Sequence, residues 1–513
     1  MTKLVFIPNL TSAQQSSIPD TVSRIARIGA SQSATTVGDA VSERAGPLAL
    51  SVSRELDAMG RRRKPLEVVD VSANGTAALV DVPQRRTLPE SSQGTFHPLV
   101  DYVPAIAMAD AGSTARMLQT SVLNQSFFKL RVEDKVTGDA MAGIVVVLRP
   151  RGAQAALSAV SAGDGSVTFG IRATSLVGAS VFIEPGFDGH WGLLMHDATL
   201  NTGDVLKVER IDLDYRRDCL RHLLHEGQGN HGEGVKVAII DTGVGPHFDL
   251  AHATGDDDTS LGHGSHVAGI VCGRGAGARA GLAPGADLLS YRVFNDAATG
   301  VAKNFEIHQA IIQAVIDGCD IINLSLKMEH PSDPMWNDEV VSTALAFASD
   351  AGVLCVAAAG NDFHNFVTFP ARHQDVVSVS ALGWEPSLPD DAYDRWTVGQ
   401  PRSTTDKDVY FASFSNVGIN GTEVDLIAPG AGVVSTVPGE QYAPMSGTSM
   451  ACPAAVGMTA RLLSDHPNVL NAPRDRQRTE AIRQLAFTHA ETAGFDARYE
   501  GRGMPMDDLA KNA

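Results

Sequence analysis

Cysteine is scarce in this sequence and shows no pairing pattern. The chain of 513 residues has five cysteines, an odd number, and no two of them stand in a Cys-x-x-Cys pair. Disulfide scaffolds and zinc ribbons need paired cysteines at short, regular spacing, so both classes of protein are excluded. Several cysteines lie in apolar runs, as Cys355 does between Leu354 and Val356. Free cysteine in such a context packs as a small buried apolar residue.

Long apolar runs are lacking as well. No stretch comes near the roughly 18 uninterrupted apolar residues that indicate a membrane-spanning helix, so we expect no membrane partner. Residues 1–8 hold one lysine and a run of four consecutive apolar residues before a proline, which is too short for the apolar core of a signal peptide. The sequence therefore predicts a cytoplasmic protein.

Basic residues are outnumbered by acidic ones. Lys and Arg total 41 against 59 Asp and Glu, a net charge of −18, whereas a general nucleic-acid binder carries a basic face. The composition is otherwise typical of a globular chain, with 43% hydrophobic and 19% charged residues. At roughly 100–200 residues per domain, this length predicts two to four domains.

The first two regions of the chain differ in pattern. Residues 1–120 are predicted to be an N-terminal α+β region, in which an Asn-Gly turn between apolar runs at 66–71 and 77–82 indicates a β-hairpin. Residues 125–215 hold short strand-like runs separated by Gly, Asp and Pro turns, which predicts a small antiparallel β-sandwich-like module. This module has no catalytic constellation, and we interpret it as a structural or binding module.

Residues 220–513 alternate strand-like and helical patterns. The runs at 235–240, 321–326 and 353–357 are mainly apolar, and helical periodicity covers 307–317. Strands that are buried on both faces have such runs. The pattern therefore predicts an α/β domain with a mostly parallel sheet flanked by helices.

A carboxylate follows the first of these runs. Residues 235–243 read Val-Lys-Val-Ala-Ile-Ile-Asp-Thr-Gly, so Asp241 stands at the carboxyl end of a predicted buried strand. Open α/β sheets place ligands and catalytic groups at that edge. Aspartic proteases also use Asp-Thr-Gly, but their chemistry needs two carboxylates that share a proton. This chain has one Asp-Thr-Gly, so we reject that interpretation.

Two histidines stand at a predicted helix start. Residues 262–269 read Gly-His-Gly-Ser-His-Val-Ala-Gly, which puts His263 and His266 three positions apart. A zinc site is not supported, because there is no His-Glu-x-x-His and no Cys or Glu at ligand spacing. This motif alone does not distinguish a structural role of the two histidines from a functional one.

A serine and an asparagine occupy comparable positions. Residues 447–453 read Gly-Thr-Ser-Met-Ala-Cys-Pro, and proline is tolerated only in the first turn of a helix. Ser449 therefore lies at or just before a helix N-terminus, where free N–H groups favour negative charge. Asn361 directly follows an apolar run and a glycine, from where its amide can point into a cleft or complete a turn.

The four motifs occur in the order Asp, His, Asn, Ser, each at a strand end or helix start of one α/β region. In this combination, residues 220–513 resemble the subtilisin-like serine proteases (subtilases, peptidase S8). Four further segments match that family: Leu282-Ala283-Pro284-Gly285-Ala286, Ile322-Asn323-Leu324-Ser325-Leu326, Phe414-Ser415-Asn416 and Ala428-Pro429-Gly430. The resemblance implies the α/β fold of the family, preceded here by the β-sandwich-like module and the N-terminal α+β region.

The resemblance implies a catalytic role for each motif residue. Ser449 would be the nucleophile, which needs an adjacent base. His263 would take the proton of the serine hydroxyl and transfer it to the leaving amine. Asp241 would hold the imidazole in the required tautomer and stabilise the imidazolium cation. Asn361 and the backbone N–H of Ser449 would form the oxyanion hole. This chemistry implies no cofactor.

Substrate binding in this family is by β-addition of an extended peptide. The resemblance puts that peptide between two segments of this chain, Ser325-Leu326-Lys327 on one side and Ala358-Ala359-Gly360 on the other. The family usually has glycine where this chain has Lys327, which alters the rim of the specificity pocket. The segment that resembles the pocket base, Thr368-Phe369-Pro370, has no acidic side chain. We therefore expect an uncharged residue before the cleaved bond.

Many relatives bind calcium in a loop after the helix of the catalytic histidine. Calcium needs about 6–8 oxygen ligands, and residues 272–281 contain two arginines and no acidic or amide side chain. We therefore expect no metal in that loop. The acidic run at 256–258 is interpreted as a solvated loop.

The leading hypothesis is a serine endopeptidase that acts on protein or peptide substrates and not on nucleic acid. Residues 1–120 fit either a propeptide or a permanent regulatory domain, and intramolecular inhibition by this region is expected. One alternative is a peptide ligase or macrocyclase that uses the same acyl-enzyme, which the triad cannot distinguish. Another is an inactive protease-like binding protein, against which the complete set of catalytic residues argues.

Overall fold

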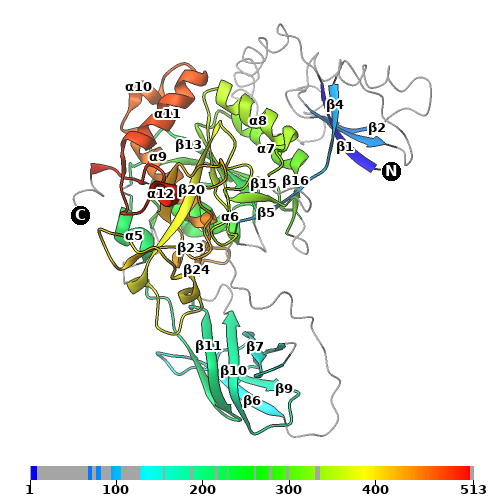
Figure 1. Ribbon diagram of the computed structural model, residues 1–513, viewed down its shortest axis with the longest axis vertical. Coiled ribbons are helices and arrows are strands. Elements are labelled where there is room, and N and C mark those ends of the chain that lie inside the picture. The colour runs from blue at the N-terminus through cyan, green and yellow to red at the C-terminus, as the bar shows by residue number, and fades with distance from the viewer. Residues whose placement is uncertain are drawn as a thin grey trace.

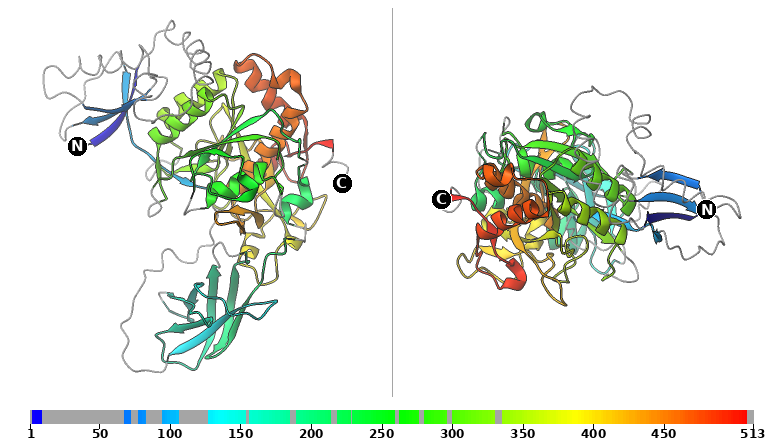
Figure 2. Two further views of the ribbon diagram at one scale, coloured as in Figure 1. Left: turned by 180° about the vertical axis from the view of Figure 1, so that it is seen from behind. Right: turned by 90° about the horizontal axis from the view of Figure 1, so that it is seen from above.

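The computed structural model describes residues 2–8, 67–71, 77–82, 94–105, 127–153, 156–184, 189–213, 218–227, 229–258, 262–275, 280–295, 300–329 and 335–508. Figure 1 shows three parts: a small N-terminal sheet, a central α/β body, and a β module at the lower end. The views in Figure 2 show that the N-terminal sheet and the β module lie on different sides of the central body. The sequence also has helical spacing over residues 39–59, broken by Gly46-Pro47, but this segment lies outside the described residues.

The N-terminal sheet is antiparallel and has the strand order β2-β3-β1-β4. Val5 and Ala77 are buried in a small apolar cluster with Phe305 and Val340 of the central body. The predicted hairpin is confirmed, since β2 and β3 pair antiparallel. The strands of this sheet are β1 (Thr2–Pro8), β2 (Glu67–Val71), β3 (Ala78–Val82) and β4 (Gly94–Pro98).

The β module stacks two sheets, β11-β10-β7-β8 and β12-β6-β9, over one apolar core. In β6, Phe128, Leu130 and Val132 point inward and alternate with exposed or half-buried residues, as expected for a strand with one buried face. The strands are β6 (Phe128–Asp134), β7 (Val145–Arg149), β8 (Leu157–Val160), β9 (Ser166–Phe169), β10 (Ser175–Glu184), β11 (Leu193–Asn201) and β12 (Val205–Val208).

The module differs from the predicted antiparallel sandwich at one edge. Strand β12 pairs parallel with β6, from Val205 opposite Arg131 to Val208 opposite Asp134. The predicted sandwich of two sheets is confirmed, and its strand pairs are antiparallel except for this one. Strand β11 was also missed, because its polar residues, such as His196 and Asp197, obscure the apolar alternation.

The central sheet has the order β14-β15-β13-β17-β19-β20-β21, with β22 also beside β20. Every pair in it is parallel except β20 with β21, which confirms the mostly parallel α/β sheet. Its strands are β13 (Lys236–Asp241), β14 (Thr254–Gly255), β15 (Asp287–Arg292), β17 (Ile321–Leu324), β19 (Leu354–Ala358), β20 (Val376–Trp384), β21 (Val409–Phe411) and β22 (Leu426–Pro429).

Helices cover both faces of this sheet. Val237 and Ile239 of β13 belong to the apolar cluster of α6 and α9, whereas Ala238 and Ile240 belong to that of α7 and α8. This two-sided burial is why the strand is a continuous apolar run. The helices are α5 (Cys219–Leu224), α6 (His263–Cys272), α7 (Asn304–Ile316), α8 (Glu339–Asp350), α9 (Thr448–Ser464), α10 (Pro467–Leu470), α11 (Arg476–Thr488) and α12 (Ala497–Glu500).

Short pieces complete the fold. The 3-10 turns are η1 (Phe248–Leu250), η2 (Glu385–Ser387) and η3 (Tyr393–Thr397). The small sheets contain β5 (Asp101–Pro104), β16 (Ala302–Lys303), β18 (Leu326–Glu329), β23 (Val433–Val437), β24 (Gln441–Met445), β25 (Ala490–Glu491) and β26 (Met504–Pro505).

The β module meets the central body at the loop between η2 and η3. The N–H of Leu194 donates to the carbonyl of Asp391 (3.1 Å), and the N–H of Tyr393 donates to the carbonyl of Gly192 (2.7 Å). The rings of Phe182 and Tyr393 lie 4.5 Å apart between their centroids. Backbone hydrogen bonds and an aromatic contact therefore join the two parts.

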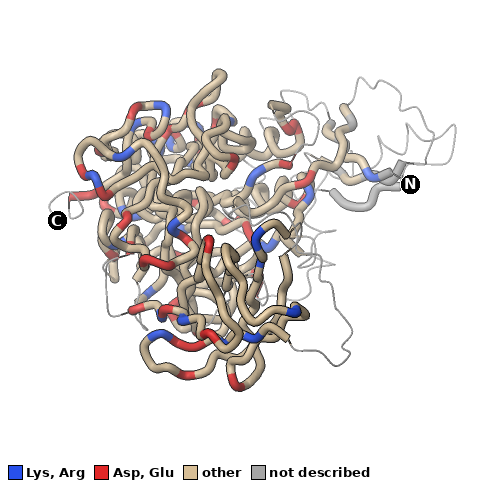
Figure 3. Tube along the Cα trace, turned by 60° about the horizontal axis from the view of Figure 1, so that its bottom comes forward, with Lys and Arg blue, Asp and Glu red and all other residues tan. Residues whose placement is uncertain are grey.

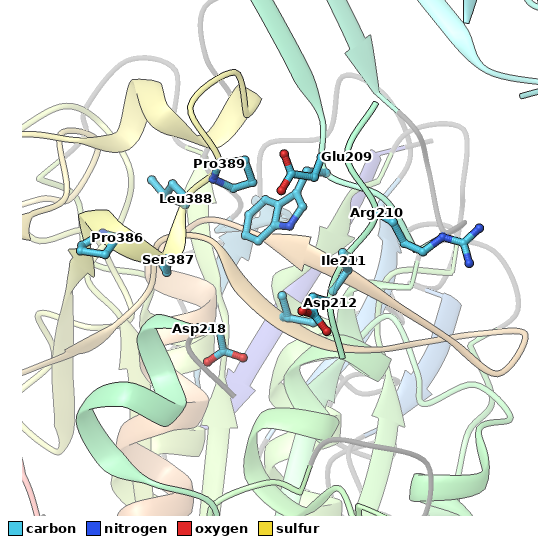
Figure 4. A pocket seen from close by; sticks show the side chains of 11 residues that line it. Glu209, Arg210, Ile211, Asp212, Asp218, Pro386, Ser387, Leu388 and Pro389 are labelled. Atoms are coloured by element: carbon cyan, nitrogen blue, oxygen red, sulfur yellow. The ribbon is translucent and has the colours of Figure 1, made fainter. Parts of the chain in front are cut away.

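A pocket of about 180 Å³ opens at this junction (Figure 4). Residues 209–212 form one wall and residues 386–389 the facing one, while the guanidinium of Arg210 points away from the space between them. None of the four predicted catalytic residues lines this pocket.

Figure 3 shows that basic and acidic residues are interspersed along the chain trace. Among the described helices, none combines the length and the apolar character that a membrane crossing requires.

Candidate active site

Asp241 ends β13 at the carboxyl edge of the sheet and is fully buried. Its Oδ1 accepts hydrogen bonds from the N–H of Thr242 and from Nδ1 of His263, both at 2.7 Å. Because a carboxylate only accepts, the proton of the imidazole lies on Nδ1. Nε2 of His263 is thereby left with a lone pair, as a general base requires.

His263 is the first residue of α6. The next residue, Gly264, donates its N–H to Oγ1 of Thr242 at 2.8 Å. A Cβ on Gly264 would lie 2.1 Å from the carbonyl oxygen of Gly243, so only glycine lets the helix start approach the end of β13 this closely. This close approach brings the imidazole to Asp241.

Ser449 is buried in the first turn of α9. Its hydroxyl donates to the carbonyl oxygen of Ser325 at 3.0 Å, and Nε2 of His263 has no hydrogen-bond partner among the described residues. The structure therefore brings His263 and Asp241 into contact but leaves the hydrogen bond from serine to histidine unmade. Such bonds often form only when a substrate is bound productively.

Two N–H donors converge on the carbonyl oxygen of Ala105. The side-chain Nδ2 of Asn361 lies 2.5 Å from this oxygen, and the backbone N of Ser449 lies 3.2 Å from it. Oδ1 of Asn361 accepts from the N–H and the hydroxyl of Thr448, at 2.9 and 2.8 Å. These two bonds fix which end of the amide faces Ala105. The donors are the pair that the resemblance assigns to the oxyanion hole.

Residues 101–105 lie along the predicted substrate-binding segment. Strand β5 runs antiparallel to β18, with Pro104 opposite Leu326 and Val103 opposite Lys327, and the N–H of Ala105 donates to the carbonyl of Ser325 at 3.2 Å. Strand β16 pairs with the other edge of β5. The chain thus inserts its own extended segment where β-addition would put a substrate.

Sequence reasoning missed this strand. It recognised an N-terminal region as far as residue 120 but assigned no contact to residues 101–105. The only local signal is the short run Tyr-Val-Pro-Ala after Asp101, which looks like any brief strand. Its partners lie more than 200 positions away in the chain.

The other predicted substrate residues have different hydrogen-bond partners. The N–H of Ala359 donates to Val379 and its carbonyl accepts from Thr368, both at 2.9 Å. The N–H of Gly360 donates to Oγ1 of Thr448 at 3.2 Å, while Ala358 is buried at the end of β19. These residues therefore support the loop that carries Asn361, and their hydrogen bonds do not run to β5.

Lys327 changes the charge at the rim of the cleft. Its Nζ lies 2.7 Å from Oδ1 of Asp362 and 3.0 Å from Oε1 of Glu329. Burial lowers the pKa of Lys327, but the two carboxylates outweigh that effect, so its pKa is raised. The ammonium group therefore offsets the charge of Asp362, and the uncharged residue before the cleaved bond stays a prediction.

His266 and Cys452 lie near the site but are tied to the backbone. Nε2 of His266 lies 3.0 Å from the carbonyl oxygens of Val433 and Ala443, and burial lowers its pKa to about 3. His266 is therefore neutral and structural. Burial raises the pKa of the Cys452 thiol, and all five cysteines are free and buried, which confirms their interpretation as packing residues.

The described residues contain no group of three or more His, Cys, Asp or Glu side chains that could hold a metal ion. Residues 276–279 of the predicted metal-free loop lie outside the described residues. The interpretation of residues 256–258 as solvated was wrong for Asp258, which is buried. Its Oδ2 accepts a hydrogen bond from Oγ1 of Thr242 at 2.7 Å.

Comparison with known proteins identifies the central body. The profile of the Subtilase family matches residues 232–503, a range that contains all four predicted catalytic residues. The chain belongs to the Subtilase family. Subtilases are serine peptidases, hydrolases that act on proteins or peptides, and the α/β fold that the resemblance implied is confirmed.

Several curated subtilases are similar to this chain. Subtilisin Savinase of Lederbergia lenta is 32% identical over 277 residues, which cover 52% of this chain and 90% of that protein. M-protease of Shouchella clausii (strain KSM-K16) is 32% identical over 253 residues, which cover 48% of this chain and 58% of that protein. The chain therefore spans less than two thirds of the length of M-protease.

Among solved structures, that of prenylagaramide maturation protease PagA is 25% identical, with a TM-score of 0.42. The match covers 55% of this chain and 93% of that one.

Proposed function

We propose that this subtilase is a serine endopeptidase with Ser449, His263 and Asp241 as its catalytic triad. The observation that carries the proposal is the position of the Ala105 carbonyl oxygen, which lies 2.5 Å from Nδ2 of Asn361 and 3.2 Å from the N of Ser449. Donors at such distances stabilise the negative charge that develops on a carbonyl oxygen under attack.

The triad acts once Ser449 turns. Rotation about its Cα–Cβ bond moves the hydroxyl from the carbonyl of Ser325 toward Nε2 of His263. The serine Oγ then attacks the substrate carbonyl carbon while Nε2 takes its proton, and Asp241 stabilises the imidazolium through Nδ1–H. The imidazolium next gives its proton to the leaving amine. Water hydrolyses the acyl-enzyme, with His263 again acting as the base.

The N-terminal region inhibits the same site in this proposal. Residues 101–105 fill the cleft as a substrate would, and their covalent tether gives them a high effective concentration against any free peptide. The bond that they present to Ser449 is the one between Ala105 and Ile106. Cleavage there separates residues 1–105, whereas the β module follows the cut and stays joined to the protease.

Labelling and intact mass test this proposal together. A fluorophosphonate probe should label Ser449 once residues 1–105 are released, and Ser449→Ala should abolish the labelling. The wild-type chain should split after Ala105, whereas the Ser449→Ala chain should stay whole. Absence of both labelling and cleavage in the wild type would contradict the proposal.

A matched control is Ser464→Ala, since Ser464 ends the same helix, α9, and has no contact with the triad residues among the described interactions. It should be labelled and cleaved like the wild type. The masses of the products also separate hydrolysis from ligation, because hydrolysis adds one water to the cleaved chain and transpeptidation adds none.

A further inference from the structure

Tyr102 is the most enclosed large side chain of the segment that occupies the cleft. It is 0% exposed and lies in register with Ala302 of β16 on one side and Met328 of β18 on the other. Its hydroxyl donates to Oδ2 of Asp338 at 2.9 Å. Counted back from the bond between Ala105 and Ile106, Tyr102 is the fourth residue before the cut.

Asp338 belongs to the protease and is fully buried. It caps α8, with Oδ1 accepting from the N–H of Val340 at 2.9 Å and from Nδ2 of Asn304 at 3.3 Å. Its other oxygen, Oδ2, faces the hydroxyl of Tyr102. Burial raises the pKa of Asp338 to about 6, as expected for a carboxyl group that little water reaches.

The walls around Tyr102 are mainly apolar, although Asn304 contacts Asp338 and the charge of Arg372 also acts on the tyrosine hydroxyl. Tyr102 belongs to the apolar cluster that includes Leu326, Met328 and Val341 of the protease. A tyrosine side chain combines an apolar ring with a terminal donor, so it matches both the walls and the carboxyl group at the end. Pairing of the peptide backbone with β16 and β18 directs the side chain at this position into the pocket.

We propose that Asp338 is a specificity-determining residue that makes this protease select tyrosine four residues before the bond it cleaves. The proposal rests on the proposed endopeptidase function and names the substrate class of that site. Phenylalanine would fill the same space but leave Oδ2 of Asp338 without its donor, and a buried polar group that loses its partner is costly. A site built around a substrate hydroxyl discriminates strongly against the analogue that lacks it.

Four peptide p-nitroanilides of the form X-Val-Pro-Ala test the proposal, with Tyr, Phe, Lys or Ala at X. They are given to the full-length preparation after self-cleavage, as checked by intact mass. We expect kcat/KM for the tyrosine peptide to exceed that for the phenylalanine peptide by about tenfold or more. Equal rates for these two peptides, or faster cleavage of the lysine peptide, would overturn the proposal while leaving the endopeptidase function standing.

Asp338→Ser is the decisive variant. Serine still caps a helix, so α8 keeps its first turn, but no carboxyl oxygen reaches the tyrosine hydroxyl. The preference for tyrosine should then vanish or reverse in favour of phenylalanine. The matched control is Asp475→Ser, because Asp475 caps α11 in the same way, by accepting from the N–H of Arg478. That variant should keep the preference of the wild type.

A second measurement needs no catalysis. In full-length Ser449→Ala protein, hydrogen exchange of the β5 amides reports how tightly the segment occupies the cleft. Tyr102→Phe and Asp338→Ser should each speed this exchange by about tenfold, and the double variant should be no faster than either single one. If the increases in exchange rate of the two single variants multiplied in the double variant, the two side chains would act independently. That result would overturn the proposal, even if no peptide were cleaved.

Discussion

The two regions that precede the protease are both built from β-strands, but they contact it in different ways. The N-terminal region sends β5 into the catalytic cleft, where the carbonyl of Ala105 meets Asn361 and Ser449. The β module docks on the loop around Asp391 and Tyr393, and its described contacts include none of the triad residues. Both regions precede the protease in the chain, so the difference between them lies in where each one docks.

The two regions also differ in what stabilises them. The β module has its own apolar core, which includes Phe128, Val146 and Val181. In the N-terminal sheet, buried Val5 instead packs with Phe305 and Val340 of the protease. The module is therefore expected to fold by itself, whereas the N-terminal sheet depends on the protease surface for its burial.

Asn361→Ala should have the largest effect, because it removes a donor that both a substrate carbonyl and Ala105 would use. Loss of one such donor typically lowers kcat by about 10²–10³-fold, and cleavage after Ala105 should slow by a similar factor. Kinetics on a free peptide and the rate of self-cleavage measure both effects. The control Asn471→Ala changes an asparagine at the end of α10, and a similar loss there would argue against a specific role for Asn361.

Asp134→Asn should weaken the β module without changing catalysis. Asp134 is buried and accepts hydrogen bonds from the N–H groups of Val136 and Thr137, and its Oδ2 also lies 3.0 Å from Nε2 of His190. Removing one charged member of such a buried network lowers the free energy of unfolding by about 2 kcal/mol or more. Thermal unfolding should reveal a less stable module while kcat on a peptide stays unchanged. A parallel loss of kcat would show that the module supports the active site.

Acid should weaken the module through the same residue. Burial raises the pKa of Asp134, but hydrogen bonds from Thr137, His190, Val136 and Arg210 outweigh it and hold the pKa well below its ordinary value. A depressed carboxyl pKa stabilises the fold above the unfolded-state value of about 3.9, and this contribution is lost as the pH falls below it. Unfolding measured between pH 6 and pH 3 should therefore show less acid sensitivity in Asp134→Asn than in the wild type.

Lys135→Ala should have the smallest effect. Its ammonium group pairs with Glu209 at 2.8 Å and with Asp391 at 3.4 Å, and all three side chains are substantially exposed. Exposed ion pairs contribute about 0–1 kcal/mol to the free energy of unfolding. Stability and kcat should stay close to those of the wild type. A large loss of either would mean that the module is attached through charge rather than through its backbone and aromatic contacts.

Much of the central fold was predictable from local patterns. Continuous apolar runs mark strands that are buried on both faces, and β13, β17 and β19 all follow that rule. Asp241 ends one of these strands, Asn361 follows another, and His263 and Ser449 lie at helix starts. Their common location at one edge of the sheet follows from the topology of parallel sheets. The cytoplasmic location drawn from composition stays a prediction.

Other features were not predictable because they join distant parts of the chain. The parallel pairing of β12 with β6, the buried state of Asp258 and the partnership of Tyr102 with Asp338 leave no periodic signal. Each depends on a surface that exists only after other elements have packed.

The chemical groups of the site and the sheet edge to which they belong could be predicted from the sequence, because residue type and strand periodicity are local properties. Only the tertiary structure decided that the cleft is filled by residues 101–105, that the carbonyl of Ala105 meets Asn361, and that the hydroxyl of Ser449 faces Ser325. These contacts span more than 100 positions. The first two arise from the packing of β5 between β16 and β18, and the third from the packing of α9 against the end of β17. No local pattern in the chain encodes either arrangement.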